Sequence, residues 1–589
     1  MKIPSFSYLA NAFGEVVKRF PFPMLAATIG TVAGMILISR HDDREVRDVL
    51  IRLLITSLLG LPTLLAAALA AEKWKLAGWK KWLPTLLALA LLLLYYFTFW
   101  LRDGDPGQRQ MIRFGGLNLL AHLLVAWLPF ADKTPVEDFW EYNKRLLVTF
   151  LIGGFYSGII YAGLSIAILA VDQLFNLDVN DDIYGQLFFF VAGIINTAFF
   201  LANFPRHFEG LAAEDSPYTV AVKNLSKFIL IPIVAIYFLI LYAYSVKILA
   251  TWELPKGWVG SLVLGFSVAG MLTYLLNYLL VKFDDNALVH GFRRWFFYVL
   301  LPLVALLFVG VGKRLSDYGV TEPRYIVAIA GVWLLLVCLY FILSKKDNIK
   351  FIPISLSLFT LLTVLSPFDA FQVSKRSQTG RLKGLLEKHE MLADGKAIPA
   401  KDTLPAADAE DIRSILYYLR DNAHFDAVGA WFGMPPEKKY PEWNEVDSIV
   451  QALKVGYGSA APSTACGYTF MRREAISVAS FDSLIWVESY LHGERQPDFT
   501  GIMISENRTG TEFFYEGKQL GSLDLQAFLK KLNDAHRCYG EALARKDGEV
   551  DWQGDSFDGR LILEEIAFEK EDSLMKLNTI RGVLLLKRK

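Results

Sequence analysis

The chain has 589 residues, of which 53% are hydrophobic and 20% are charged, and its 60 basic residues equal its 60 acidic residues in number. Typical soluble domains carry about 25% charged residues, so this composition disfavours an entirely soluble protein, and the even charge balance disfavours a nucleic-acid partner. Three cysteines exclude a disulfide scaffold and a cysteine-rich metal module.

The charged residues are distributed unevenly along the chain. Residues 1–366 contain 31 Lys/Arg and 25 Asp/Glu, whereas the shorter segment 367–589 contains 29 and 35. The first part is therefore poor in charge, and the second has the charge density of an ordinary soluble protein. This difference predicts two physical environments for one chain.

Residues 1–19 form the first predicted element. Lys18 and Arg19 end this segment, and we expect it to lie on the membrane surface as an amphipathic helix that is retained rather than cleaved as a signal peptide. The apolar residues expected on one face of this helix are Leu9, Phe13, Val16, Val17 and Phe20.

Residues 20–368 contain eleven stretches of at least 18 residues without Asp, Glu, Lys or Arg. A helix needs roughly 20 apolar residues to cross the hydrocarbon of a bilayer. The run Leu86–Leu94 is apolar on every face, unlike the strand of a membrane barrel. The sequence therefore predicts an α-helical polytopic membrane protein with about eleven transmembrane helices. The stretches are Phe20–Ser39, Leu53–Ala71, Trp82–Leu101, Phe114–Ala131, Leu146–Val171, Ile183–Pro205, Phe228–Val246, Gly257–Val281, Trp295–Gly312, Tyr325–Ser344 and Phe351–Phe368.

The loops between these stretches carry an asymmetric positive charge. Loops on the side of the N-terminus contain 19 Lys/Arg, and loops on the opposite side contain 12. Basic loops remain preferentially in the cytoplasm. We therefore expect a cytoplasmic N-terminus and, because eleven is odd, a C-terminal domain on the extracytoplasmic side.

A few polar residues within or beside the stretches form a candidate polar site in the bundle. Asn118 precedes His122 by four residues, so the two side chains share a helix face. Asn196 and Asn277 lie in later stretches, and Asp172 begins a loop without basic residues. Two interpretations stay open: these residues line a cavity for a polar-headed lipid or another substrate, or they form hydrogen bonds between packed helices.

Asp42 and Asp43 are weak candidates for catalytic residues. They lie in the first loop opposite the N-terminus, where membrane glycosyltransferases that use lipid-phosphate sugar donors carry an acidic pair. The loop from Arg40 to Arg52 is very short for a catalytic site, and its mixed charges also fit a solvated turn. Both interpretations are kept.

Residues 369–589 are long enough to fold as a separate domain. The pattern is helical to about Lys454, and short β-like runs follow, so we expect an α+β domain. No sequence motif in it indicates a catalytic site, a metal site or a cofactor. The predicted strands are Ala475–Val478, Ser483–Tyr490, Thr500–Ser505, Thr511–Tyr515, Arg560–Phe568 and Arg581–Leu586.

Cys466 and Cys538 both lie in this domain. An extracytoplasmic location permits a disulfide bond between them, which would close a loop of about 70 residues and stabilise the fold by roughly 4 kcal/mol. Two buried free thiols are the alternative.

Several strings resemble one bacterial membrane family. They include LAHLLVAWLPF (120–130), YGQLFFFVAGIINTAFFLANFP (184–205) and GRLKGLLEKHEMLADGKAIP (380–399). They are similar to the family catalogued as domain of unknown function 4153. The resemblance implies a multi-pass protein of the bacterial inner membrane, and it implies no activity.

The leading functional hypothesis is an integral membrane protein, uncertain as an enzyme but more consistent with a non-enzyme, whose external domain binds a ligand or an envelope component. Its expected partners are the lipid bilayer and an envelope lipid, glycan or protein. One alternative is a transporter or lipid-handling protein that uses the polar site in the bundle. The other is a membrane enzyme similar to the glycosyltransferases.

Overall fold

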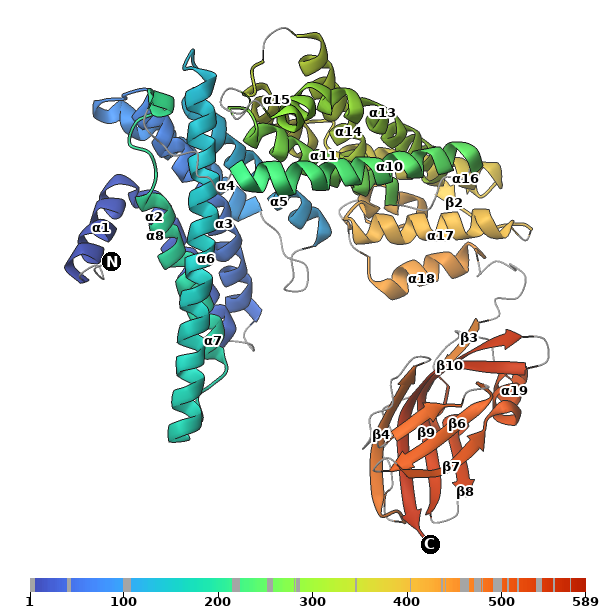
Figure 1. Cartoon of the computed structure of the whole chain (residues 1–589). Coiled ribbons are helices and arrows are strands. Elements are labelled where there is room, and N and C mark those ends of the chain that lie inside the picture. Colours follow the sequence, from blue (N-terminus) through green and yellow to red (C-terminus); the bar gives the residue numbers. More distant parts are fainter. Residues whose placement is uncertain are drawn as a thin grey trace. The chain divides into compact units, whose positions relative to one another are not determined.

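The structure is a computed structural model of the whole chain (Figure 1). The residues it describes are 6–39, 44–98, 107–213, 223–251, 258–279, 281, 286–344, 347–402, 404–435, 438–439, 441–455, 465–470, 478, 480–490, 501–505, 508–515, 518–535, 543–553, 557–571 and 574–589.

The chain forms two compact units. The first contains Met1–Ala397 and Ile415–Asp447, and the second contains Ile398–Ser414 and Ser448–Lys589. By contacts, the helical segment after the membrane part thus belongs largely to the first unit. The predicted boundaries at residues 19 and 368 stay predictions.

The first unit is almost entirely helical (Figure 1). Its N-terminal helices are α1 (Phe6–Arg19), α2 (Pro21–Ser39), α3 (Arg44–Lys73), η1 (Gly78–Trp82), α4 (Leu83–Thr98), α5 (Gln108–Trp127), η2 (Leu128–Phe130), α6 (Val136–Phe175), α7 (Asp182–Phe190), η3 (Val191–Ile195), α8 (Asn196–Ala202) and η4 (Leu211–Ala213). Its later helices are η5 (Leu225–Leu230), α10 (Ile231–Thr251), α11 (Trp258–Leu276), α13 (Ala287–Tyr318), α14 (Glu322–Leu343), α15 (Phe351–Leu365) and α16 (Ala370–Lys388).

A small hairpin and short helices complete this region. They are β1 (Leu392–Ala393), β2 (Lys396–Ala397), η6 (Phe425–Ala427) and η7 (Gly429–Phe432). At α17 (Ala406–Asp421) and α18 (Trp443–Ala452) the chain passes between the two units.

The described part of the chain has nine helices long and apolar enough to cross a membrane, or ten if α15 and α16, which are bent by 49°, count as one span. In their described residues, all eleven predicted stretches lie largely on helices. Two of the eleven stretches lie on helices that are not among the nine. These helices are α11, whose apolar run Gly260–Leu276 is shorter, and α15, which has 15 residues. The prediction of a polytopic helical membrane protein is confirmed.

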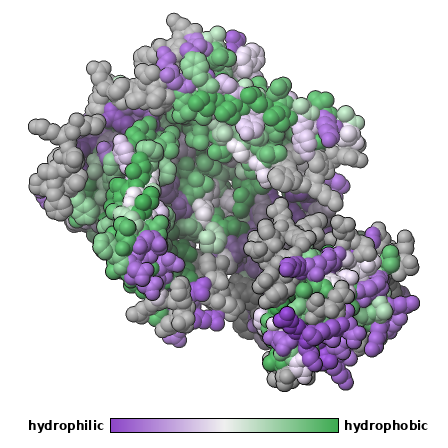
Figure 2. Space-filling view, turned by 60° about the horizontal axis from the view of Figure 1, so that its bottom comes forward, coloured by the Kyte–Doolittle hydropathy of each residue, from purple (hydrophilic) through white to green (hydrophobic). Residues whose placement is uncertain are grey.

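Many large apolar side chains of the first unit point outward. Leu86, Leu94, Phe97 and Leu239 are 60–74% exposed, and Figure 2 shows broad hydrophobic areas on the helical part of the chain. A water-soluble surface rarely exposes such large apolar areas, whereas lipid tails solvate them. The exposure therefore agrees with helices that face hydrocarbon.

Contacts between loops show which helix ends lie on the same side of the helical bundle, and they define two sets of helix ends. At one end, Arg19 donates to the carbonyl of Phe204 at 3.0 Å, and Lys350 donates to that of Thr134 at 2.6 Å. At the other, Tyr325 donates to the carbonyl of Phe368 at 2.6 Å. We name the first set the N-terminal-side ends. Helix α15 (Phe351–Leu365) lies between Lys350 and Phe368, so it connects the two sets despite its short length.

Helix α11 also connects the two sets of helix ends. Near its start, a Cβ added to Gly260 would lie 3.3 Å from Val327, close to the N-terminus of α14. At its end, Trp140 in the first turns of α6 donates to the carbonyl of Leu275 at 2.5 Å. These contacts support the alternation of loops that the eleven predicted stretches imply.

In its described residues, the second unit contains two antiparallel sheets and one α-helix between strands (Figure 1). The five-stranded sheet has the order β3-β9-β10-β4, with β8 beside β9, and the three-stranded sheet has the order β5-β6-β7. The elements are β3 (Ala465–Thr469), β4 (Ser483–Tyr490), β5 (Gly501–Ile504), β6 (Gly510–Tyr515), β7 (Lys518–Asp524), α19 (Gln526–Ala535), η8 (Arg545–Gly548), β8 (Glu549–Gln553), β9 (Phe557–Glu571) and β10 (Leu574–Arg588).

The core of this unit comes from alternate residues of β9 and β10. Leu561, Leu563 and Phe568 on β9, with Ile580 and Leu584 on β10, are at most 1% exposed. Figure 2 shows a largely hydrophilic surface on the strand-rich part of the chain. The predicted C-terminal α+β domain is confirmed, while the strand predicted over 475–478 lies almost wholly outside the described residues.

Candidate functional site

The first unit contains a cavity of about 590 Å³ between α5, α6, α11, α14 and α15. This volume is within the usual range of ligand pockets, about 300–1,000 Å³. Among the described residues that line it, Asn143 and Lys144 are the two polar ones, and the other side chains are apolar. A cavity of this composition suits a hydrocarbon chain.

The cavity is partly open to the outside of the helical unit. Its wall includes Leu119, Leu147, Val268 and Leu272, which are 37–53% exposed. Because these residues lie on membrane-spanning helices, an apolar molecule dissolved in the bilayer reaches the cavity without crossing water.

Indole groups fix the walls of the cavity. Trp140 donates to the carbonyl of Leu275 on α11, and Trp333 on α14 donates to the hydroxyl of Ser355 on α15 at 3.0 Å. Each tryptophan thus satisfies its polar group on a neighbouring helix and turns its apolar ring toward the cavity. Neither tryptophan was predicted from the sequence to be part of a site.

The polar end of the cavity lies near the N-terminal-side ends. Lys144 forms an ion pair with Glu141 at 2.7 Å, and Arg145 pairs with the same carboxylate at 2.9 Å. Lys144 and Glu141 are 8% and 4% exposed. Asn143 donates to the carbonyl of Ala126 on α5 at 3.1 Å. These groups give an otherwise apolar cavity one polar end.

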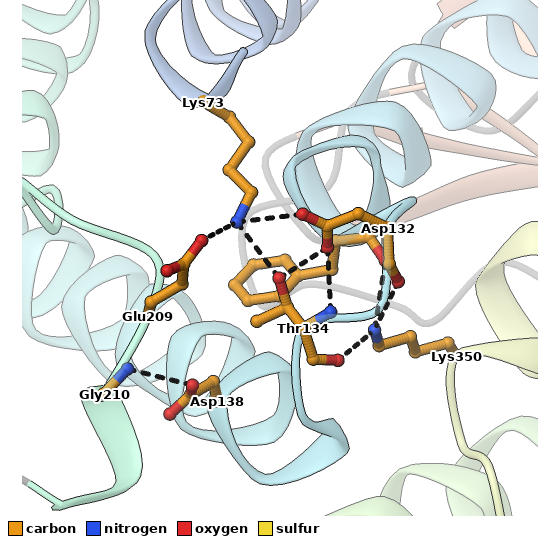
Figure 3. Close-up of polar contacts among 8 residues, drawn as sticks. Lys73, Asp132, Thr134, Asp138, Glu209, Gly210 and Lys350 are labelled. Carbon is orange, nitrogen blue, oxygen red and sulfur yellow. Dashed lines mark hydrogen bonds and ion pairs between the residues drawn. The ribbon is translucent and has the colours of Figure 1, made fainter. Parts of the chain in front are cut away.

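A second polar cluster joins the loops at this same end (Figure 3). The ammonium of Lys73, at the end of α3, lies 3.1 Å from a carboxylate oxygen of Asp132 and 2.8 Å from one of Glu209. It also donates to the hydroxyl of Thr134 at 3.0 Å. The C-terminal end of a helix favours a cation such as Lys73. The ammonium of Lys73 in turn joins two separate loops, because it pairs with Asp132 in one and with Glu209 in the other.

The carboxylates of this cluster are strongly acidic. Burial acts to raise the pKa of Asp132, but hydrogen bonds from Thr134 and Lys73 outweigh it and lower the pKa to about 2. The hydrogen bond from Lys73 lowers the pKa of Glu209 as well. The contribution of Asp132 to stability is therefore fully present above its ordinary pKa near 4 and is lost as the pH falls toward 2.

Lys350 closes the cluster (Figure 3). Its ammonium donates to the backbone carbonyls of Phe130 at 3.1 Å, Asp132 at 3.4 Å and Thr134 at 2.6 Å. Burial lowers the pKa of this lysine, and the charge of Asp132 opposes that effect. Nearby, Asp138 accepts hydrogen bonds from the N–H groups of Gly210 and Ala212, both at 2.9 Å. The cluster is saturated by its own members, which indicates a structural role.

A third polar cluster is buried at the opposite helix ends. Glu322, in the first turn of α14, accepts a hydrogen bond from the Tyr418 hydroxyl at 2.6 Å and lies 3.2 Å from Nε2 of His424. Glu322 and His424 are each 1% exposed. Burial, and then the charge of Glu322, raise the pKa of Tyr418. This cluster attaches residues 415–447 to a membrane helix.

The predicted polar site in the bundle is dispersed over several helices. Asn118 donates to the carbonyl of Leu58 at 3.2 Å, and His122 lies 2.9 Å from the carbonyl of Asn118. Asn196 accepts from Ser157 at 3.3 Å. In these contacts the side chains join neighbouring helices or bond within their own helix, as the interhelical interpretation expects.

Asn277 and Asp172, the other residues of the predicted polar site, also bond to groups close to them. Asn277, which is fully buried, donates to Ser226 at 2.6 Å and to the carbonyl of Thr273 at 2.7 Å. Asp172 accepts from the backbone N–H of Val179 at 2.9 Å, which closes the turn after α6. The candidate cavity is lined by different residues.

The other predicted site residues lie partly outside the described residues. Asp42, Asp43 and Cys538 are in segments that the structure does not describe. Cys466 is disulfide-bonded and fully buried, and Cys338 is a buried free thiol. The pairing of Cys466 with Cys538 therefore stays a prediction. Within the described segments, no group of three or more His, Cys, Asp or Glu is arranged to hold a metal ion.

Comparison with known proteins identifies one family and one relative. The family model described as "Domain of unknown function (DUF4153)" matches residues 25–400. An uncharacterized protein of Pasteurella multocida (strain Pm70) is 25% identical over 394 residues, which are 66% of this chain and 63% of that protein. The match thus spans less than two thirds of the relative. No solved structure matches the chain.

Proposed function

The chain belongs to the DUF4153 family, and from that premise we propose that it is a lipid-handling protein of the bacterial inner membrane that binds a hydrocarbon chain inside its helical bundle. The family match confirms the resemblance seen in the sequence, and its description carries no activity. The observation that supports the proposal is the apolar cavity, which opens toward lipid and has Lys144 and Asn143 among its lining.

The composition of the cavity selects its ligand. A water-soluble substrate would leave its polar groups unpaired against an apolar wall, at a cost of several kcal/mol. An acyl or isoprenoid chain has no such groups. Asn143 and the ion pair of Lys144 with Glu141, at the polar end of the cavity, suit a ligand with a polar head.

We expect Ala330→Phe to fill part of the cavity and to weaken binding about tenfold, because inserting atoms into an occupied site costs about 1–3 kcal/mol. Ala330 lines the cavity on α14. The measurement is titration of the purified full chain in detergent with cis-parinaric acid, a fluorescent fatty acid.

The matched control is Val332→Phe. Val332 lies on the same helix but is 37% exposed and does not line the cavity, so this variant should bind like the wild type. Equal affinity of Ala330→Phe and wild type, with unchanged thermal unfolding, would contradict the proposal.

For the orientation, we propose a cytoplasmic N-terminus and a periplasmic second unit. The excess of basic residues in the N-terminal-side loops supports it, and so does the disulfide-bonded state of Cys466, because disulfides persist mainly in oxidising compartments. The contacts of α11 and α15 support an odd number of passages between the two sets of helix ends.

We expect the chain, trapped by alkylation in intact cells, to migrate faster in a denaturing gel without reductant than with it. The shift should disappear in both Cys466→Ser and Cys538→Ser and persist in Cys338→Ser. A shift that survives in Cys538→Ser would contradict the predicted pairing, and fully alkylated thiols at 466 and 538 would contradict the periplasmic location.

The hypothesis that the second unit binds an envelope component is retained as a second candidate. Leu484 and Trp486 on β4, an edge strand of the five-stranded sheet, are 42% and 67% exposed. Large apolar side chains on a sheet edge are typical of surfaces that add a further chain.

A further inference from the structure

A separate pocket of about 450 Å³ lies between the start of α2, the end of α3 and the start of α4. We call it the basic pocket. Its floor is apolar and includes Phe22, Leu64 and Ala68. The charged residues of its rim are Lys18, Arg19, Glu72, Lys75 and Lys81.

The basic residues of the rim differ in whether they form an ion pair. Arg19 forms a bidentate ion pair with Glu72, at 3.0 and 2.9 Å, and also donates to the carbonyls of Phe204 and Pro205. The one rim carboxylate is therefore neutralised by Arg19. In the part of the chain that the structure describes, Lys75 and Lys81 make no ion pair, and Lys81 lies 4.8 Å from the centre of the Trp82 ring.

Lys75 occupies a backbone position that usually carries glycine. The N–H groups of Lys75 and Leu76 donate to the carbonyls of Glu72 and Ala71, both at 3.1 Å, and Lys75 has a φ of 49°. This is the left-handed residue that terminates a helix in a Schellman motif. A lysine there costs stability relative to glycine, yet it adds a positive charge to the rim.

The surroundings place the basic pocket at the level of lipid headgroups. Trp74, Trp79 and Trp82 are 50%, 73% and 43% exposed around the end of α3 and the start of α4. Tryptophan gathers where hydrocarbon meets water. Helix α1 adds Phe13 and Val17, which are 42% and 39% exposed, as expected of a helix that lies in this interface.

We propose that the basic pocket binds the phosphate of an anionic phospholipid headgroup. Lys75 and Lys81 contact the phosphate, with Lys18 at the outer rim, and the glycerol and upper acyl carbons lie against Phe22 and Leu64. This site is independent of the apolar cavity, because no residue lines both. A soluble anion would gain the charges but not the apolar floor.

The test is lipid binding to the purified full chain, measured by native mass spectrometry with phosphatidylglycerol and with phosphatidylcholine of identical acyl chains. The double variant Lys75→Gly with Lys81→Gln should bind phosphatidylglycerol about 25-fold more weakly, since each basic residue near an anionic headgroup contributes about fivefold. Its affinity for phosphatidylcholine should not change. Glycine suits the left-handed position 75, so the variant is expected to fold.

The matched control is Lys80→Gln. Lys80 is exposed and adjacent to Lys81 but does not line the basic pocket, so its loss should leave the preference for phosphatidylglycerol intact. Ala330→Phe should leave it intact as well. The proposal is overturned if the double variant keeps the preference, if Lys80→Gln abolishes it equally, or if inorganic phosphate at equal concentration displaces the lipid.

Discussion

Replacing Glu322 by alanine is expected to lower the free energy of unfolding of the first unit by about 3–5 kcal/mol. Removing one partner of a buried charged network costs this much, because the remaining groups stay buried without their acceptor. His424 and the Tyr418 hydroxyl would lose the carboxylate that both contact, at 3.2 and 2.6 Å. The measurement is unfolding in detergent micelles titrated with dodecyl sulfate.

The same variant should also release residues 415–447 from α14. Limited proteolysis should then cut within this segment at lower protease concentration than in the wild type. Glu322→Gln, which keeps the size of the side chain and one acceptor oxygen, should lose less stability than Glu322→Ala.

The control for this prediction is Asp317→Asn. Asp317 pairs at 2.9 Å with Lys313, whose side chain is 60% exposed, and exposed pairs contribute about 0–1 kcal/mol. If Asp317→Asn were as destabilising as Glu322→Ala, the loss would reflect charge in general rather than the buried cluster.

The sequence predicts the membrane helices well because hydrocarbon imposes a strict requirement on composition. Runs without charge mark where a helix can lie in lipid, but they do not mark where it begins or ends. Helix α6 illustrates this difference, since the predicted stretch Leu146–Val171 lies within a helix that extends over Val136–Phe175. Its first turns contain Glu141, Lys144 and Arg145, whose charges pair along the helix.

The polar clusters were not predicted, and their contacts explain why. Glu322 and His424 are 102 residues apart, and Lys350 and Thr134 are 216 residues apart. Nothing in the local pattern around Lys350 distinguishes a lysine that binds three carbonyls from one in a solvated loop. The polar residues that the sequence does emphasise, such as His122 and Asn196, bond to their own or an adjacent helix.

The apolar cavity was equally invisible in the sequence. Its lining residues are those of any membrane helix, and a void arises only from the way five helices pack. Composition shows that a side chain is apolar, but whether it packs against a neighbour or borders a void depends on the tertiary structure.

Lys350→Met is the second variant for which a large loss is expected, about 3 kcal/mol in the free energy of unfolding of the first unit. Hydrogen bonds to a charged donor contribute about 1.5–3 kcal/mol each, and two of the three carbonyls lie within 3.1 Å of the ammonium. Removing the cost of burying that ammonium offsets part of the loss, since methionine is apolar. The net effect is therefore smaller than the sum of the bonds.

Lys350→Met should also change the shape of the apolar cavity, because Ile349 and Ile352, close to Lys350 in the chain, line it. We expect Lys350→Met to weaken the binding of cis-parinaric acid as well as to lower stability. Lys133→Met is the control, since Lys133 is an exposed lysine between Asp132 and Thr134, in the loop whose carbonyls Lys350 binds. If both variants unfold like the wild type, the three carbonyls must be satisfied by another donor, and Lys350 does not hold this end of the bundle together.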